Sequence, residues 1–183
     1  GRFNTRLSLS SSNTDEVIKK RILQKNDSVS SSLSQLWDSS KDIMRNQLSF
    51  SSDNASMKFY RDKEDFVDTY PFVTYQFELL QKVFESIRKA GATGKHLAQG
   101  ERSMLDSFQL AARKVSNQEL GTLVPFYEFY ESINSFLDSI VVRSINLAGE
   151  RDSLNDFDGK MLKTLFLIRY VDMVKSNIEN LVT

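Results

Sequence analysis

Apolar residues recur about every 3.6 positions in several long segments of the chain, and this period is typical of helices that bury one face. The first segment follows residues 13–16, whose Asn-Thr-Asp-Glu sequence has the form of a capping box with Asn13 as the N-cap. A second segment, the serine-rich residues 28–48, keeps the same spacing. The pattern therefore predicts two helices before residue 49.

The pattern is interrupted where Ser, Asp, Asn and Gly cluster, because these residues favour turns and compete for backbone hydrogen bonds. Residues 49–56 and 91–100 are predicted to be loops. We assign the carboxylate pairs Asp15/Glu16 and Glu64/Asp65 to caps and surface charge, since catalytic carboxylates need burial to shift their pKa. Four further helices are expected: from Pro71 to Gly91, from Met104 to Val115, from Pro125 to Val141, and from an N-cap at Asp156 or Asp158 to Ile178.

These segments predict an all-α fold, an irregular bundle of about six helices. Two prolines and seven glycines are too few for a sheet-rich domain with many tight turns, and the alternation in residues 3–9 allows at most a short N-terminal strand remnant. The 13 Phe and 6 Tyr residues are expected to pack in the core. We divide the chain into a lid-like helical region, residues 1–117, and a pair of long helices, residues 118–183, that packs on it. The alternative is that both parts form one continuous domain.

Composition excludes several classes of site. Lys plus Arg and Asp plus Glu number 24 each, so overall charge does not favour a polyanion or an anionic membrane. The absence of cysteine rules out disulfides and thiolate metal sites, and the single histidine, His96, leaves imidazole metal sites and Ser/His/Asp triads very poorly supplied. We predict no catalytic residue, no bound metal and a cytoplasmic location. The start without Met indicates a fragment of a longer protein.

One stretch departs from the charge balance. Residues 91–96 superficially suggest a phosphate-binding P-loop, but the glycine spacing, the following hydroxyl residue and the preceding strand are all missing. Basic residues nevertheless outnumber acidic ones between residues 79 and 114. The candidates for nucleic-acid contact in this stretch are Lys89, Lys95, His96, Arg102, Arg113 and Lys114.

The chain also resembles a known family over nearly its whole length. The similar segments are residues 2–11 and 13–23, Tyr70-Pro71-Phe72, residues 75–81, Gly94-Lys95-His96-Leu97, residues 100–105 and residues 162–170. They resemble the large P-loop ATPases of BREX phage-defence systems, the BrxC/PglY family, in the region after the nucleotide-binding core.

The resemblance implies a role within a larger bacterial ATPase of AAA+ type. The chain would be a non-catalytic lid or interdomain scaffold that couples nucleotide state to domain arrangement, with ATP and Mg²⁺ bound by the parent protein rather than by this fragment. Arg102, Lys95 and Arg6 are the implied candidates for contact with the nucleotide phosphates. A DNA-binding module that uses the 79–114 basic stretch, and an interaction domain that binds other defence proteins or itself, remain as alternatives.

Overall fold

The computed structural model describes residues 11–50, 57–89, 100–135, 137, 139–149, 154–169 and 171–181. These residues form helices without a sheet, which confirms the all-α prediction, although the helices are more numerous than the expected six. The proposed N-terminal strand remnant lies outside the described residues. In chain order the elements are α1 (Ser11–Arg21), α2 (Asp27–Gln47), α3 (Lys63–Thr69), α4 (Tyr75–Lys89), α5 (Gly100–Val115), the 3-10 helix η1 (Phe126–Phe129), α6 (Tyr130–Asn134), α7 (Ser139–Gly149), α8 (Asp156–Ile168) and α9 (Ile178–Leu181).

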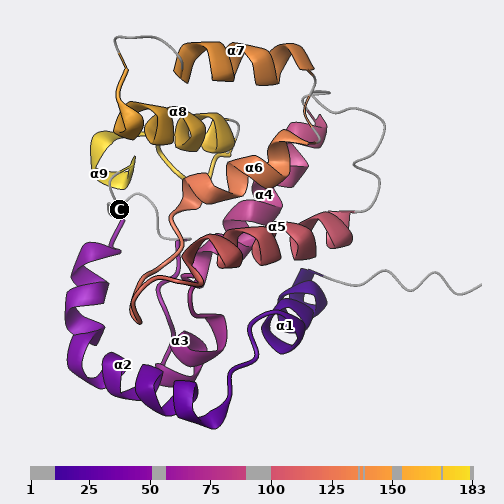
Figure 1. Cartoon of the computed structure of the whole chain (residues 1–183). Helices are drawn as coiled ribbons and strands as arrows, with labels where there is room; N and C mark the ends of the chain where they lie inside the picture. The colour runs from indigo at the N-terminus through magenta and orange to yellow at the C-terminus, as the bar shows by residue number, and fades with distance from the viewer. Residues whose placement is uncertain are drawn as a thin grey trace, which may run out of the picture.

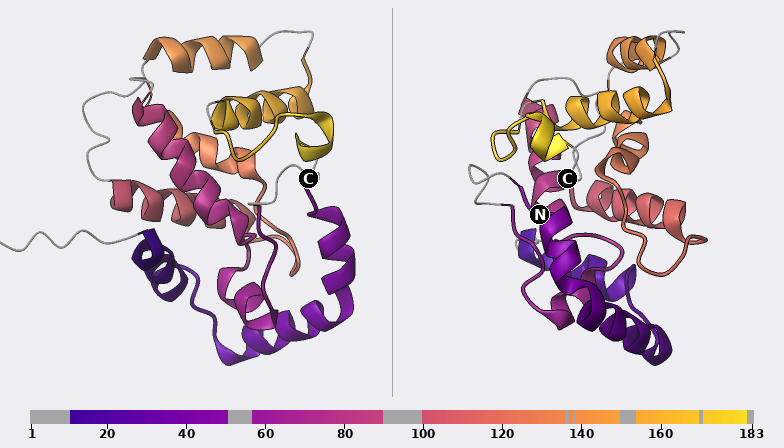
Figure 2. Two further views of the ribbon diagram at one scale, coloured as in Figure 1. Left: turned by 180° about the vertical axis from the view of Figure 1, so that it is seen from behind. Right: turned by 90° about the vertical axis from the view of Figure 1, so that its left-hand side faces the viewer.

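The helices form a lower group, a central group and an upper group in the view of Figure 1. Helices α1, α2 and α3 lie below, α4, α5 and α6 cross the centre, and α7, α8 and α9 lie above. Helix α2 packs on α3, α5 packs on α1, η1 and α6, and α8 packs on η1, α6 and α7. Figure 2 shows that the same vertical order holds from two further directions. None of the described helices has the length and apolar character needed to cross a membrane.

Aromatic side chains fill the centre of the molecule, as predicted. Phe108 of α5 is fully buried, with its ring centroid 4.5 Å from that of Phe77, 4.7 Å from that of Phe72 and 5.2 Å from that of Phe129. Such offset and edge-on contacts add to the stabilisation that burial of the rings provides. The cluster joins α4, α5, η1 and the turn before α4 into one core.

Helix α2 agrees closely with its prediction, whereas the predicted N-cap of the first helix is wrong. Asn13 lies inside α1, which already includes Ser11. The start of α2 is capped by Asn26, whose Oδ1 accepts a hydrogen bond of 2.9 Å from the backbone N–H of Val29. A similar cap, Asp62, begins the short helix α3, which the apolar pattern did not reveal.

The helix expected from Pro125 to Val141 is divided into η1, α6 and α7. Ser132 Oγ donates to the backbone oxygen of Phe129 and Ser135 Oγ donates to that of Ser132, each at 2.8 Å. Serine side chains that bond to the preceding turn in this way weaken the regular helical pattern. The apolar spacing of the sequence thus continues between the end of α6 and the start of α7, where the helix is interrupted.

The last predicted helix is also shorter than expected. Helix α8 ends at Ile168, and α9 begins at Ile178, where Asn177 Oδ1 accepts a 2.9 Å hydrogen bond from the backbone N–H of Asn180. The N-cap of α8 is Asn155 rather than either aspartate, and Asp158 completes its capping box.

Candidate functional site

The predicted basic residues that the structure describes lie on α4 and α5. Lys89 ends α4, Arg102 lies in the first turn of α5, and Arg113 and Lys114 lie in its last turn; all four side chains are exposed. Since a helix rises 1.5 Å per residue with 3.6 residues per turn, Arg102 and Arg113 share one face of α5 about 16 Å apart. The cations are therefore distributed along a surface and do not converge on a single phosphate-sized site.

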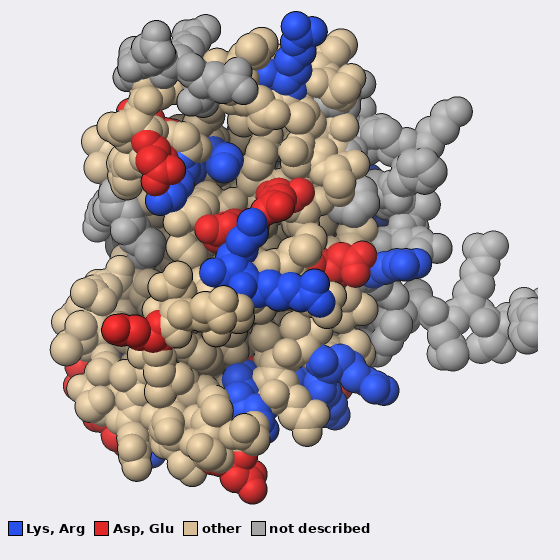
Figure 3. Space-filling model, viewed as in Figure 1, with Lys and Arg blue, Asp and Glu red and all other residues tan. Residues whose placement is uncertain are grey.

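Carboxylates neutralise part of this surface. The Nζ atom of Lys114 lies 2.6 Å from Glu131, and that of Lys82 lies 3.4 Å from Glu85. In the face shown in Figure 3, basic and acidic side chains are interspersed across the centre of the molecule. Lys89, Arg102 and Arg113 form no ion pair with a described residue.

The other three candidates for phosphate or nucleic-acid contact, Arg6, Lys95 and His96, lie outside the described residues. Their roles stay predictions, as does the phosphate contact assigned to Arg102. Among the described residues, no group of three or more His, Cys, Asp or Glu side chains is arranged to hold a metal ion.

Two carboxylates that the sequence assigned to caps and surface charge depart from that assignment. Asp15 is half-buried in α1, and burial raises its pKa to about 6. Asp65 departs further. Its side chain has an exposed fraction of 0%, so its assignment to the surface is wrong. It accepts hydrogen bonds from the Thr74 hydroxyl at 2.8 Å, from Lys19 Nζ at 3.2 Å, and from the backbone and guanidinium N–H groups of Arg61 at 3.2 and 3.3 Å. These bonds tie α1 and the turn before α4 to α3.

The electrostatics of Asp65 indicate a structural role. Burial alone would raise its pKa, but the hydrogen bonds from Thr74 and Arg61 and the charge of Lys19 lower the pKa below its usual value. A carboxylate that is held ionised with its oxygens occupied by donors is a poor general base. Asp65 therefore stabilises the arrangement of the helices and offers no free oxygen for chemistry.

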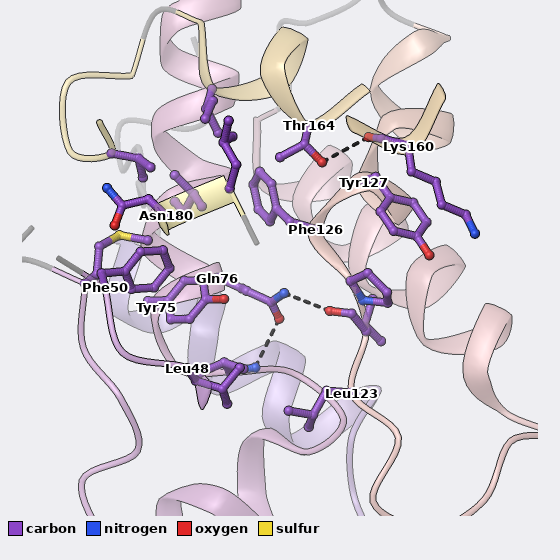
Figure 4. A pocket seen from close by; sticks show the side chains of 18 of the residues that line it. Leu48, Phe50, Tyr75, Gln76, Leu123, Phe126, Tyr127, Lys160, Thr164 and Asn180 are labelled. Atoms are coloured by element: carbon purple, nitrogen blue, oxygen red, sulfur yellow. Dashed lines mark hydrogen bonds between the residues drawn. The ribbon is translucent and has the colours of Figure 1, made fainter. Parts of the chain in front are cut away.

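A cavity of about 390 Å³ lies between the end of α2, the start of α4, residues 123–127, α8 and α9 (Figure 4). Its walls are mainly aromatic and aliphatic. They include Phe50, Tyr75, Leu79, Phe126, Phe157 and Ile168. Concave apolar sites of about 300–1,000 Å³ are typical of small-molecule pockets. Its lining residues come from six segments that are separated along the chain, residues 48–50, 57, 73–79, 123–127, 157–168 and 174–181, which explains why no local sequence pattern predicts it.

Gln76 forms part of the wall and is only 2% exposed. Its Oε1 accepts a 3.0 Å hydrogen bond from the backbone N–H of Val73, and its Nε2 donates a 2.8 Å bond to the backbone oxygen of Val124 (Figure 4). The backbone N–H of Val124 in turn donates to the oxygen of Pro71 at 2.9 Å. The amide of Gln76 thus holds residues 71–73 and 124 together.

Tyr127 and Lys160 lie beside each other at one side of the cavity, opposite Asn180 (Figure 4). The Nζ atom of Lys160 is 5.5 Å from the centroid of the Tyr127 ring and 2.6 Å from a carboxylate oxygen of Asp156. The Lys160–Asp156 pair is exposed, so it contributes little to stability and is open to exchange with another anion.

Helix α7 has apolar side chains on both of its faces. Val141 and Ile145 are half-buried and pack against the core, whereas Ile140 is 74% and Leu147 is 53% exposed. Ile140 and Leu147 are seven residues apart and share one face. Figure 1 shows α7 at the outer edge of the molecule, over α8. The sequence placed Ile140 in a buried stripe, which the structure corrects.

The comparisons with known proteins add no assignment. No protein-family model matches the chain, and no solved structure matches it.

Proposed function

We propose that this chain is a non-catalytic helical scaffold of a large bacterial phage-defence ATPase and that it binds a neighbouring domain of that protein through the outer face of α7. The class of parent protein comes from the sequence resemblance. The observation that carries the binding role is the exposure of Ile140 and Leu147 on a helix whose other face is already packed.

A helix that is apolar on all sides is normally covered on all sides. Helix α7 is covered by α8 on one side, and its outer face is exposed among the described residues. Arg143, between the two exposed apolar side chains in sequence, is itself exposed and adds a positive charge to this face. An apolar patch with a polar rim is the composition of a protein-protein contact.

The test is association of the chain with the nucleotide-binding core of an ATPase of the resembling family, measured by calorimetry or co-elution. The double variant I140S/L147S is expected to weaken binding by at least tenfold. Because both side chains are exposed, the variant should retain the fold and the unfolding midpoint of the wild type.

Ile43 provides a matched control. It is an exposed isoleucine, 59% accessible, on α2, a helix of the lower group that does not pack on α7. Ile43→Ser should leave the association unchanged. Equal binding by the wild type and the I140S/L147S variant would refute the assigned surface.

The lid role makes a separate prediction about Arg102. This side chain is exposed at the start of α5 and forms no ion pair with a described residue, so its guanidinium is available for a phosphate. In the parent ATPase, Arg102→Ala should slow ATP hydrolysis, while Lys41→Ala on α2 should not. Unchanged hydrolysis in the Arg102 variant would remove this residue from the proposal.

DNA binding is the second candidate, favoured by Arg102 and Arg113 on one face of α5. Charge reversal of both residues should abolish binding of a DNA duplex at low salt, whereas Lys41→Glu should have little effect. The candidate is rejected if the wild-type chain binds no DNA at low salt.

A further inference from the structure

We propose that the cavity between α4, α8 and α9 binds an uncharged, mainly apolar molecule that carries a single hydroxyl or carbonyl group, as naphthol does. The apolar part of the molecule occupies the interior, and its polar group forms a hydrogen bond with the hydroxyl of Tyr75. This site is separate from the outer face of α7 and does not depend on the proposed scaffold role.

The interior of the cavity excludes charged ligands. Lys160 is the only charged residue among the described residues that line it. The Nζ atom of Lys160 lies 2.6 Å from a carboxylate oxygen of Asp156, which is not part of the wall, and Figure 4 shows this ammonium group directed away from the apolar side chains. An ion in the interior would lose its hydration without gaining a counter-charge, so the cavity favours a neutral molecule.

Several polar groups of the wall are already bonded within the protein. The amide of Gln76 is bonded on both sides, as described above. The hydroxyl of Thr164 donates a 3.1 Å hydrogen bond to the backbone oxygen of Lys160, and Nδ2 of Asn180 donates a 2.9 Å bond to that of Lys175. These groups therefore have little hydrogen-bonding capacity left for a ligand.

Tyr75 is different, because its side chain is buried and its hydroxyl is unpaired. The residue is 8% exposed, and its hydroxyl makes no hydrogen bond with a described residue. Phe50 fixes the ring through an edge-on contact, with the centroids 4.9 Å apart and the planes at 88°. In Figure 4 the Tyr75 hydroxyl points from the ring toward the middle of the lining side chains.

This hydroxyl selects one polar group on the ligand. Burial raises the pKa of Tyr75 above its ordinary value, so the hydroxyl stays protonated and can either donate or accept a hydrogen bond. A buried hydroxyl without a partner is unfavourable, and a ligand hydroxyl or carbonyl oxygen would remove that cost. A pure hydrocarbon would fill the same space without this gain.

The volume and the walls define the rest of the ligand. A water molecule takes up about 30 Å³ of liquid, and a CH group is of similar size, so about 390 Å³ holds on the order of ten such groups. The rings of Phe126 and Phe157 line the cavity and can pack against a planar aromatic ligand. Phe157 is also 61% exposed, so it lies where the cavity meets solvent.

The experiment is calorimetric titration of the full chain with naphthol, naphthalene and naphthoate, which share one ring system and differ in one group. Naphthol should bind about fivefold more tightly than naphthalene, because it gains one buried hydrogen bond. Naphthoate should bind at least tenfold more weakly than naphthol, because its charge has no partner in the interior. Absence of saturable naphthol binding, or tighter binding of naphthoate, would overturn the proposal.

Tyr75→Phe removes only the oxygen that the proposal uses. This variant should weaken naphthol about fivefold and leave naphthalene unchanged. Because the hydroxyl has no protein partner to lose, the unfolding midpoint of the variant should not fall, as it would if the hydroxyl had a structural role. Equal affinity of the wild type and the Tyr75→Phe variant for naphthol would refute the assigned hydrogen bond.

Tyr130 supplies the matched control. It is 4% exposed and its hydroxyl is also unpaired, but it does not line the cavity. Tyr130→Phe should therefore change the affinity for neither ligand. Val174→Phe, in the wall, should fill the cavity and weaken naphthol and naphthalene at least tenfold. Binding that survives Val174→Phe would show adsorption elsewhere and refute the site.

Discussion

The hydrogen bonds of Gln76 permit a sharp test of how the two sides of the cavity are joined. Replacement by glutamate keeps the shape of the side chain and the acceptor that faces the Val73 N–H. It also replaces the donor that faces the Val124 carbonyl, at present 2.8 Å away, with a second oxygen. At neutral pH an ionised, buried carboxylate would then lie against a carbonyl oxygen.

The magnitude follows from the burial of all three residues. Gln76, Val73 and Val124 are each 2% exposed, so water does not replace the lost bond. A buried acceptor left unsatisfied costs about 1–3 kcal/mol, and burial of the new charge adds to that cost. We expect Gln76→Glu to lower the free energy of unfolding by about 3 kcal/mol at pH 7. With a urea dependence of about 2 kcal/mol per molar, the midpoint falls by about 1.5 M.

The sign of the pH dependence is fixed by the same geometry. In the Gln76→Glu variant, the pKa of the introduced carboxyl is expected to be higher in the folded state than its unfolded value of about 4.3, because only the protonated carboxyl can donate to Val124. Between these two pKa values the folded variant binds more protons than the unfolded variant. The loss of stability relative to the wild type is therefore greatest above the pKa that the new carboxyl has in the folded state, and it becomes smaller as the pH falls toward the pKa of that carboxyl in the unfolded state.

Trp37 is the single tryptophan and is 7% exposed, which makes its fluorescence a suitable probe of urea unfolding. The difference between wild type and Gln76→Glu should be large at pH 7 and smaller at about pH 4.5. Gln118→Glu, an exposed site, is the control and should change neither value. A variant that unfolds at the wild-type midpoint at pH 7 would refute the reasoning.

Three other perturbations test the structure. Asp65→Ala should lower the free energy of unfolding by about 2 kcal/mol in urea titrations, because it removes the acceptor that Lys19, Arg61 and Thr74 share, although Lys19 and Arg61 are partly open to water. The exposed neighbour Glu64→Ala should change it by less than about 0.5 kcal/mol. Equal effects would contradict the structural role assigned to Asp65. Burial lowers the pKa of Lys25 in the folded state to about 8. The unfolded chain therefore binds more protons than the folded chain above that pH, and the free energy of unfolding of the wild type should rise by about 2 kcal/mol between about pH 7.5 and 9.5. Lys25→Gln should remove this rise in urea titrations. Gly121 has φ of 107°, which a residue with a Cβ rarely adopts, so Gly121→Ala should be destabilised by about 1 kcal/mol in thermal unfolding. Gly159 lies in α8 with open space around it, and alanine favours a helix over glycine, so Gly159→Ala should be stabilised by about 0.5–1 kcal/mol.

Regular helices are predictable here because their apolar faces are continuous. In α4 the residues chosen by spacing, such as Leu80 and Val83, are fully buried, and in α2 Leu33 and Trp37 face the core. The breaks are not predictable in this way, since apolar spacing continues through residues 135–138 and 169–177. The described residues beside these ranges make local hydrogen bonds that an apolar pattern does not register: the Ser132 and Ser135 hydroxyls donate to backbone oxygens, and Asn177 Oδ1 accepts from the Asn180 N–H.

The candidate sites were less accessible to sequence reasoning because their parts are distant along the chain. Asp65 accepts a hydrogen bond from Lys19, 46 residues earlier, and Gln76 is bonded to Val124, 48 residues later. The charge count between residues 79 and 114 identified an exposed basic surface but not the carboxylate of Glu131 that neutralises part of it.

The two halves of the molecule share one apolar core but differ in the hydrogen bonds that supplement it. In the α1–α4 half, hydrogen bonds from Lys19 to Asp65 and from Gly121 to the Tyr70 hydroxyl add to the apolar packing, whereas α8 packs through Ile168 and the edge-on contact of Phe166 with Tyr130. Hydrogen bonds restrict direction, while apolar contacts tolerate small shifts. The α7–α8 end should therefore open locally at lower cost, and hydrogen exchange should be faster there than in α3 and α4. Equal exchange rates in α8, α3 and α4 would contradict this division.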